Sequence, residues 1–290
     1  MVYGYVFIMP WLIGFLLFFV KSMMTTIVFS LHNLKIDPLG GYTLEWVGFE
    51  NYVFAFTEHA DYNRILVESI QNILIDVPLI IFFSLFIAIL LNQSFKGRTV
   101  IRAIFFLPVI LMSPAVMTAL SSAMDMMAGG ISTVPQDMQQ TDGFSARYLL
   151  QTFISLGFPA GLLDYVEDAV NRVYDIVKAS GVQILIFLAA LQSIPGALYE
   201  VAKIEGATAY ESFWKVTLPM VSPLILTNVV YTIVDYFVVS EVVDVSYITA
   251  FTSLNFGLSS TMSIISTTAV SLILLITGYV ISKKVFYNNA

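Results

Sequence analysis

Six polar side chains lie inside two strongly apolar stretches of this sequence. They are Asn72, Asp76, Asn228, Tyr231, Asp235 and Tyr236. A charge at the centre of a membrane helix costs about 3 kcal/mol, so such carboxylates are functional candidates by default. Hydrogen-bonding groups beside flat aromatic rings also suit a sugar. We therefore expect these residues to line a path for a polar substrate, more strongly in the second stretch than in the first. The alternative is that the aspartates cap or pair helices and that the tyrosines belong to an interfacial belt.

Other chemistries find little support in the residue types. The chain has no cysteine, which removes disulfides and thiolate sites. His32 and His59 stand apart, too few and too distant to build a metal site. No nucleophile and base are paired in the apolar stretches, so an intramembrane enzyme is not expected. The net charge of −7 argues against nucleic acid as a partner.

The elements that must position these residues are membrane helices. The 290 residues are 58% hydrophobic and 11% charged, with a mean hydropathy of +0.85, far from soluble globular composition. A bilayer core needs about 20 apolar residues per helix. The qualifying windows are Val6–Leu31, Ile70–Leu91, Ala103–Met127, Val182–Tyr199, Met220–Val239 and Met262–Ile281. We therefore expect an all-α polytopic protein with about six transmembrane helices in one domain, residues 1–290.

Lysine and arginine set the expected orientation, because they concentrate in cytoplasmic loops. With a cytoplasmic N-terminus, seven bases fall in the inner segments: Lys96, Arg98, Arg102, Lys203, Lys215, Lys283 and Lys284. The longer outer segments carry five bases and most of the acids. Both termini and the segment Leu198–Pro219 are then cytoplasmic, whereas residues 128–180 form an extracellular insertion. Within it, Tyr148–Val177 predicts one or two amphipathic surface helices, and Lys35–Glu68 predicts a loop on the membrane interface.

Leu198–Pro219 is a short segment of charged and small residues between two apolar windows. It predicts a helix, a turn and a second helix, where Gly206 permits a close approach or a sharp bend. Pro219 is expected to restart the chain into the next membrane helix. Small residues on one side and large apolar anchors on the other suit insertion into a partner's groove. An ordinary helical cytoplasmic loop is the alternative.

The same residues, YEVAKIEGATAYESFWKVTLP (Tyr199–Pro219), resemble the EAA loop of ATP-binding cassette importer permeases. That pattern has Glu-Ala-Ala, three residues to a glycine, and an apolar run ending in Leu-Pro. Matches are Glu200, Ala202, Gly206, Ala207, Phe213, Thr217, Leu218 and Pro219, and the departures are Val201 and Glu205. The resemblance extends to ILIFLAALQSIPGALYE, PWLIGFLLFF, WVGFENY and FKGRTVIRAIFFLP, so it covers most of the chain outside Ala128–Ser180. It points to the carbohydrate-uptake branch, especially permeases for complex oligosaccharides.

The resemblance implies a division of labour. The ATPase-coupling residues would be Glu200, Ala202, Lys203, Glu205, Gly206, Ala207, Phe213, Leu218 and Pro219. ATP and Mg²⁺ would be bound by two copies of a separate ATPase subunit, because this chain has no G-x-x-x-x-G-K-[ST] motif. The chain itself would be a transport subunit without a cofactor or a catalytic residue. It would pair with a second, similar permease, expected to be a different chain, with a homodimer as the alternative. It would receive its oligosaccharide from an extracellular binding protein at a bacterial cell membrane.

An ion-coupled secondary sugar carrier is the competing function. Asp76 and Asp235 could then serve a proton or sodium relay. The sequence lacks an evident inverted repeat, and its cytoplasmic segment matches an ATPase-docking motif. Both observations favour the ATP-driven importer.

Overall fold

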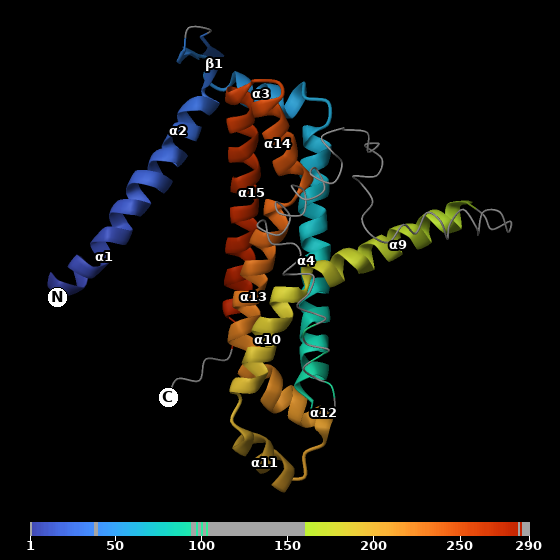
Figure 1. Cartoon of the computed structure of the whole chain (residues 1–290). Coiled ribbons are helices and arrows are strands. Elements are labelled where there is room, and N and C mark those ends of the chain that lie inside the picture. Colours follow the sequence, from blue (N-terminus) through green and yellow to red (C-terminus); the bar gives the residue numbers. More distant parts are fainter. Residues whose placement is uncertain are drawn as a thin grey trace, which may run out of the picture. The chain divides into compact units, whose positions relative to one another are not determined.

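The fold is given by a computed structural model that describes residues 2–37, 40–93, 97, 100, 103, 160–283 and 285 (Figure 1). The helices before the long gap are α1 Val2–Gly14, η1 Phe15–Val20, α2 Lys21–Ser30, α3 Glu50–Thr57 and α4 Tyr62–Asn92. The helices after it are α9 Ala160–Ala179, α10 Gly181–Ser193, α11 Gly196–Ile204, α12 Ala209–Ser212, η2 Phe213–Thr217, α13 Leu218–Val238, α14 Glu241–Phe251 and α15 Phe256–Ser282. η1 and η2 are π-helical turns. Two strands, β1 His32–Ile36 and β2 Tyr42–Trp46, form an antiparallel hairpin.

Four helical segments are long and apolar enough to cross a membrane. They are Ile8–Ser30, Tyr62–Asn92, Ala209–Phe251 and Phe256–Ser282. They contain or closely match the first, second, fifth and sixth predicted windows. A bent pair of helices within the described residues raises the number to five if it counts as one span. The third window, Ala103–Met127, lies almost wholly outside the described residues, so the expected six spans are not confirmed as a number.

The fourth window, Val182–Tyr199, is not one continuous helix as predicted. Helix α10 ends at Ser193 after 13 residues, which gives it a length of about 20 Å and leaves it short of the hydrocarbon core. Ile194 and Pro195 are extended, with ψ of 122° and 129°. A residue before proline is pushed out of the helical region, and this explains the break. Helix α10 instead follows α9 across a bend of 53° at Ser180.

One compact unit contains residues 2–77 and 230–283. Helix α15 packs against α2, α3 and α14. The buried apolar core of this unit is formed by Ala55, Tyr62, Ile65, Leu66, Val242, Leu258 and Met262. Two hydrogen bonds tie distant parts of this unit: Tyr62 OH donates to the Met262 carbonyl at 2.8 Å, and Thr261 Oγ1 donates to the Ser30 carbonyl at 3.1 Å.

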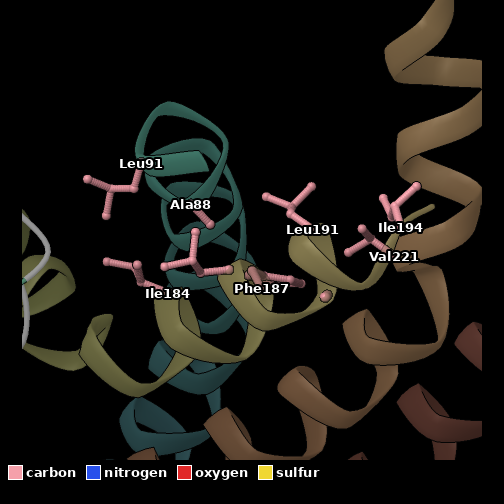
Figure 2. Packing of buried hydrophobic residues seen from close by; sticks show 9 residues of the cluster. Ala88, Leu91, Ile184, Phe187, Leu191, Ile194 and Val221 are labelled. Carbon is pink, nitrogen blue, oxygen red and sulfur yellow. The ribbon is translucent and has the colours of Figure 1, made fainter. Parts of the chain in front are cut away.

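The other unit contains the described residues of 78–229. Figure 2 shows its core, where side chains of the second half of α4, of α10 and of the start of α13 gather. The core residues are Ala88, Leu91, Ile184, Phe187, Leu188, Ala190, Leu191, Ile194 and Val221. Beside them Asn228 Nδ2 donates a hydrogen bond to the Gln183 carbonyl at 3.1 Å. Helices α10 and α13 are thus joined by apolar packing and by a polar tie.

One of the two predicted outer segments contains more regular structure than the sequence predicted. The segment Lys35–Glu68, predicted as an interfacial loop, contains most of the β1–β2 hairpin and α3. The hairpin is a small addition to a mostly helical fold, so the predicted all-α class is confirmed. A hairpin joined by a turn containing Gly40 and Gly41 was readable from the alternating residues on either side. In the insertion 128–180, the described part contains one of the expected amphipathic helices, α9. Its remainder lies outside the described residues.

Candidate functional site

The predicted helix, turn and helix between the membrane segments is present. Helix α11 spans Gly196–Ile204, and after a turn the chain becomes helical again at Ala209. From there the helical path runs through α12, η2 and α13 to Val238 without interruption. Pro219 therefore does not restart the chain, as the sequence suggested. It lies two residues beyond the π-helical turn Phe213–Thr217, where the altered hydrogen-bond pattern accommodates a residue that lacks an N–H.

The turn after α11 is closed by a Schellman motif. The Gly206 N–H donates to the Lys203 carbonyl at 3.1 Å, and the Ala207 N–H donates to the Ala202 carbonyl at 2.9 Å. Gly206 has φ of +77°, a conformation that other residues adopt at a cost. A Cβ added to Gly206 would meet no described atom of the chain within 4 Å. Within this chain, glycine is thus needed for the backbone angle and not for space.

The second arm begins with a capping box. The Glu211 N–H donates to Thr208 Oγ1 at 3.3 Å, and the Thr208 N–H donates to Glu211 Oε2 at 2.9 Å. The Thr208 hydroxyl also donates to Glu211 Oε2 at 2.9 Å. This glutamate precedes the apolar window that starts at Met220. Glu211 also lies 3.8 Å from Lys215 Nζ, in an exposed ion pair that adds little.

A side-chain hydrogen bond joins the two arms. The hydroxyls of Tyr199, in α11, and Thr217, in η2, lie 3.0 Å apart in a hydrogen bond. Thr217 is buried, and Tyr199 is half-buried. The Schellman motif and the capping box shape the turn between the arms, and this bond joins the arms away from the turn. The three features together fix the angle between the arms. We call Gly196–Thr217 the coupling loop from here on.

The coupling loop presents large apolar side chains at its surface. Ile204 is 85% exposed and Tyr210 71% exposed, and Trp214 and Val201 are also exposed. Of the sequence-predicted coupling residues, the exposed ones are Glu200, Lys203, Glu205 and Gly206. The half-buried ones are Ala202, Ala207, Phe213, Leu218 and Pro219. A fixed backbone that displays apolar and charged groups together has the properties of a docking element.

Within the membrane segments, the structure brings two of the predicted path residues into contact. Tyr236 OH, on α13, donates a hydrogen bond to Asp76 Oδ2, on α4, at 2.6 Å. Asp76 is buried, with 8% of its surface exposed. The short distance is typical of a hydroxyl that donates to a carboxylate. This pair ties the two helices inside the first unit.

The other predicted path residues lie in different surroundings. Asn228 is fully buried in the second unit, where its amide donates a hydrogen bond to the Gln183 carbonyl. Asn72, Tyr231 and Asp235 are exposed on their helices. Tyr231 and Asp235 are four residues apart, on one face of α13. All six residues remain predictions for the path, and these three are the ones whose side chains are exposed in the chain by itself.

Two features of the site were missed by sequence reasoning. The capping box was readable, because Thr208-Ala-Tyr-Glu211 has the S/T-x-x-E spacing that starts a helix. The bond between Tyr199 and Thr217 had no comparable signal, since it depends on the angle at which two helices meet. Among the described residues, no group of three or more His, Cys, Asp or Glu could hold a metal ion.

The chain is similar to known membrane components of transport systems. Residues 176–288, which include the coupling loop, α13 and α15, match the family described as binding-protein-dependent transport system inner membrane component. The probable ABC transporter permease protein YesP of Bacillus subtilis is 30% identical over 243 residues, covering 81% of this chain and 70% of that protein. The trehalose/maltose transport system permease protein MalF of Thermococcus litoralis is 28% identical over 242 residues, covering 83% and 75%.

A solved structure shares the fold. It is a chain of a bacterial ABC transporter involved in the import of the acidic polysaccharide alginate, with a TM-score of 0.64 and 20% identity. The match covers 96% of this chain and 94% of the other. The same kind of transporter has been solved in complex with an alginate pentasaccharide-bound periplasmic protein, and that chain matches with a TM-score of 0.61.

Proposed function

The chain belongs to the permease family of binding-protein-dependent ABC transporters, in its carbohydrate-uptake branch, and from this premise we propose that it is a membrane-spanning subunit of an ATP-driven oligosaccharide importer. The observation that carries the proposal is the coupling loop. Its backbone is fixed by local hydrogen bonds, its surface is apolar and charged, and it lies inside the region that matches the family.

The coupling loop docks on a separate ATPase. Ile204, Tyr210 and Trp214 offer apolar anchors, and Glu200, Lys203 and Glu205 offer charged contacts beside them. Such a helical element enters a groove with its apolar side first. The ATPase binds ATP and Mg²⁺, because no P-loop is present in this sequence. Its closure moves the coupling loop, and α13 carries that movement into the membrane because the helix is continuous with the second arm.

An oligosaccharide is the proposed substrate. The exposed groups on α4 and α13, Asn72, Tyr231 and Asp235, combine hydrogen bonding with an aromatic face, which is what a sugar ring requires. The names of two relatives support the class, since one is a trehalose/maltose permease and the other belongs to an alginate importer. Alternating access would expose these groups first to one side of the membrane and then to the other.

The assembly follows the family pattern. A second permease subunit, two ATPase subunits and an extracellular binding protein complete the importer. The complex of the alginate transporter with a sugar-loaded periplasmic protein supports the last of these partners. The chain is a multi-pass protein of the bacterial cell membrane, and we place both termini on the cytoplasmic side, where the coupling loop also lies.

An ion-coupled secondary carrier is not favoured. Its two carboxylates would have to load and release an ion together, yet Asp76 is buried and accepts a hydrogen bond from Tyr236, whereas Asp235, the residue before Tyr236, is exposed. Such a carrier would also need no ATPase-docking element, although the exposed coupling loop has the properties of one.

The deciding experiment is purification of the tagged chain from its own host, followed by reconstitution of the purified assembly. We expect an ATPase and a second permease to copurify, and ATP hydrolysis to rise when the binding protein and a matching oligosaccharide are added. A scan of oligosaccharides then identifies the substrate by the largest stimulation. Uptake by the isolated chain without ATP, driven by an ion gradient, would overturn the proposal.

A further inference from the structure

The β1–β2 hairpin separates its side chains into an apolar and a polar face. Residues opposite each other in an antiparallel pair point to the same side, and successive residues alternate. The pairing joins His32 with Trp46, Leu34 with Leu44, and Ile36 with Tyr42, so these six residues share one face. The other face carries Asn33, Lys35, Thr43 and Glu45. On that face Lys35 Nζ lies 2.8 Å from Glu45 Oε2 in an exposed ion pair.

Most of the apolar face is left uncovered by the described part of the chain. Trp46 is 68% exposed, Tyr42 56% and Ile36 51%, whereas Leu34 is buried at 8%. A two-stranded hairpin is marginally stable in water and needs a surface against which to pack its apolar side. Something other than water must therefore meet this face.

The hairpin is held firmly at the end of a membrane span. The N–H groups of Val47 and Gly48 both donate to the Leu31 carbonyl at 3.1 Å. Asn51 Nδ2 donates to the Ser30 carbonyl at 3.0 Å and to the His32 carbonyl at 3.2 Å. Ser30 is the last residue of the apolar span that begins at Ile8. The hairpin therefore starts two residues beyond the span.

Close packing between α15 and the start of the hairpin also holds the hairpin in place. Gly257, in the first turn of α15, approaches the His32 carbonyl so closely that a Cβ there would lie 2.3 Å from the oxygen. A strand of five residues reaches only about 16 Å, and the headgroup layer on each side of a bilayer is about 5–7 Å deep. A hairpin tethered in this way has to lie in or beside that layer.

The chain after the hairpin continues the same pattern. Phe49, Val53 and Phe56 are all exposed, and their spacing places them on one side of α3 and the turn that precedes it. The segment then enters the second span at Tyr62. Both ends of residues 31–61 are thus fixed at the ends of apolar helices, and the segment between them exposes tryptophan, tyrosine and phenylalanine.

We propose that the β1–β2 hairpin is an interfacial anchor that lies in the lipid headgroup layer, with Ile36, Tyr42, Leu44 and Trp46 against the acyl-chain boundary and Lys35 and Glu45 toward water. Tryptophan and tyrosine are the residues that favour this layer, because their rings are apolar and their tips are polar. A lipid surface is already present beside the span to which the hairpin is tied. The anchor fixes the depth of α2 and α15, and this role is independent of which substrate the protein transports.

The absence of cysteine from the sequence allows a direct test without background substitutions. Single variants Tyr42→Cys, Thr43→Cys and Leu44→Cys are labelled with a nitroxide in the full transporter assembly, reconstituted in phosphatidylcholine and phosphatidylglycerol vesicles. Collisions with oxygen report lipid, and collisions with a water-soluble nickel chelate report water. Phe18→Cys, in the middle of the first span, gives the lipid reference, and the free label in buffer gives the water reference.

We expect labels at positions 42 and 44 to favour oxygen by several-fold over nickel, and the label at position 43 to show the reverse. Equal nickel access at all three positions would overturn the anchor by showing that the apolar face meets water. Loss of access to both reagents at positions 42 and 44, present from the start or appearing when the binding protein is added, would overturn it in favour of a protein partner.

A second measurement leaves the hairpin unaltered. The chain has three tryptophans, so Trp11→Phe with Trp214→Phe leaves Trp46 as the only tryptophan of the purified chain, excited apart from its tyrosines at roughly 295 nm or above. Its fluorescence is compared in vesicles with lipids brominated near the headgroup and lipids brominated deep in the acyl chain. Stronger quenching by the shallow bromines is expected. Absence of quenching by either lipid would contradict the proposal even if a cysteine variant had failed to fold.

Discussion

The coupling loop and the Asp76–Tyr236 pair are both candidate parts of the transport machinery, but they are held in opposite ways. Every backbone bond that shapes the turn of the loop joins residues at most five positions apart, as in Ala207 to Ala202. The bond from Tyr236 to Asp76 joins residues 160 positions apart. The first region can form from its own sequence, whereas the second exists only after the membrane helices have assembled.

This difference predicts different responses to mutation. A change in the coupling loop alters its shape and its exposed surface while the membrane helices remain folded, so coupling fails before stability does. A change at the pair weakens the contact between α4 and α13, so stability falls together with transport. Measurements of ATP-coupled uptake and of thermal unfolding, made on the same variants, separate the two responses.

The largest effect is expected from Gly206→Val. A β-branched residue at φ of +77° costs about 1–2 kcal/mol of strain, enough to shift the turn to another shape. We expect oligosaccharide uptake to fall by about tenfold or more, since 1.4 kcal/mol already corresponds to a factor of ten. The midpoint of thermal unfolding should stay close to that of the parent protein.

Gly206→Asn is the matched control, because asparagine tolerates positive φ and an added Cβ meets no described atom of the chain within 4 Å. It should retain most of the uptake. If asparagine is as damaging as valine in a folded protein, a surface of the ATPase packs against this position, and space rather than backbone angle is the requirement.

Asp235→Asn should have the next largest effect on uptake. Asp235 is exposed on α13, so replacing its carboxylate with an amide leaves the packing of the helix intact. Loss of one charged hydrogen bond to a sugar hydroxyl is worth about 1.5 kcal/mol, or about tenfold in the KM for uptake. Uptake is measured as a function of oligosaccharide concentration, with assembly checked by copurification. An unchanged KM would return Asp235 to a structural role.

Tyr236→Phe tests the opposite kind of site. Removing the hydroxyl that lies 2.6 Å from Asp76 should lower the free energy of unfolding by about 1–2 kcal/mol, the upper range for hydrogen bonds between membrane helices. The KM for uptake should change little. Tyr231→Phe, at an exposed position on the same helix, is the control and should leave the unfolding midpoint unchanged. A higher KM with normal stability would instead place Tyr236 on the substrate path.

The sequence predicted those parts of the molecule whose cause is local. Four of the six apolar windows correspond to helices of spanning length, because hydropathy over about 20 residues is a property of the segment itself. The bend of the coupling loop was expected at Gly206, which has positive φ in the structure. The capping box at Thr208 was equally readable from its spacing.

The remaining features depend on contacts between distant residues or on competing local signals. No sequence pattern near Asp76 predicts that Tyr236 donates a hydrogen bond to its carboxylate. Similarly, nothing in the sequence near Asn228 indicates that its amide donates a hydrogen bond to the Gln183 carbonyl of α10. In the fourth window, hydropathy favoured one long helix, but Pro195 forced its neighbour into an extended conformation and ended α10 early.

The smallest effect is expected from Thr208→Ala, which tests whether the coupling loop is as independent as its local bonds imply. Alanine removes the side-chain acceptor for the Glu211 N–H and should cost the second arm about 1 kcal/mol. Since α13 continues that arm, fraying should be confined to the first turns of the arm. We expect uptake to fall by about twofold to fivefold, and the protein to stay folded, because this cost is a fraction of its total stability. Hydrogen exchange at residues 209–217 measures the fraying directly.

Thr208→Ser keeps the acceptor and should match the parent protein in both exchange and uptake. Faster exchange that spreads through α13 into the region of Tyr236 would show that the loop and the membrane pair form one cooperative element, and the distinction between the two regions would then be wrong.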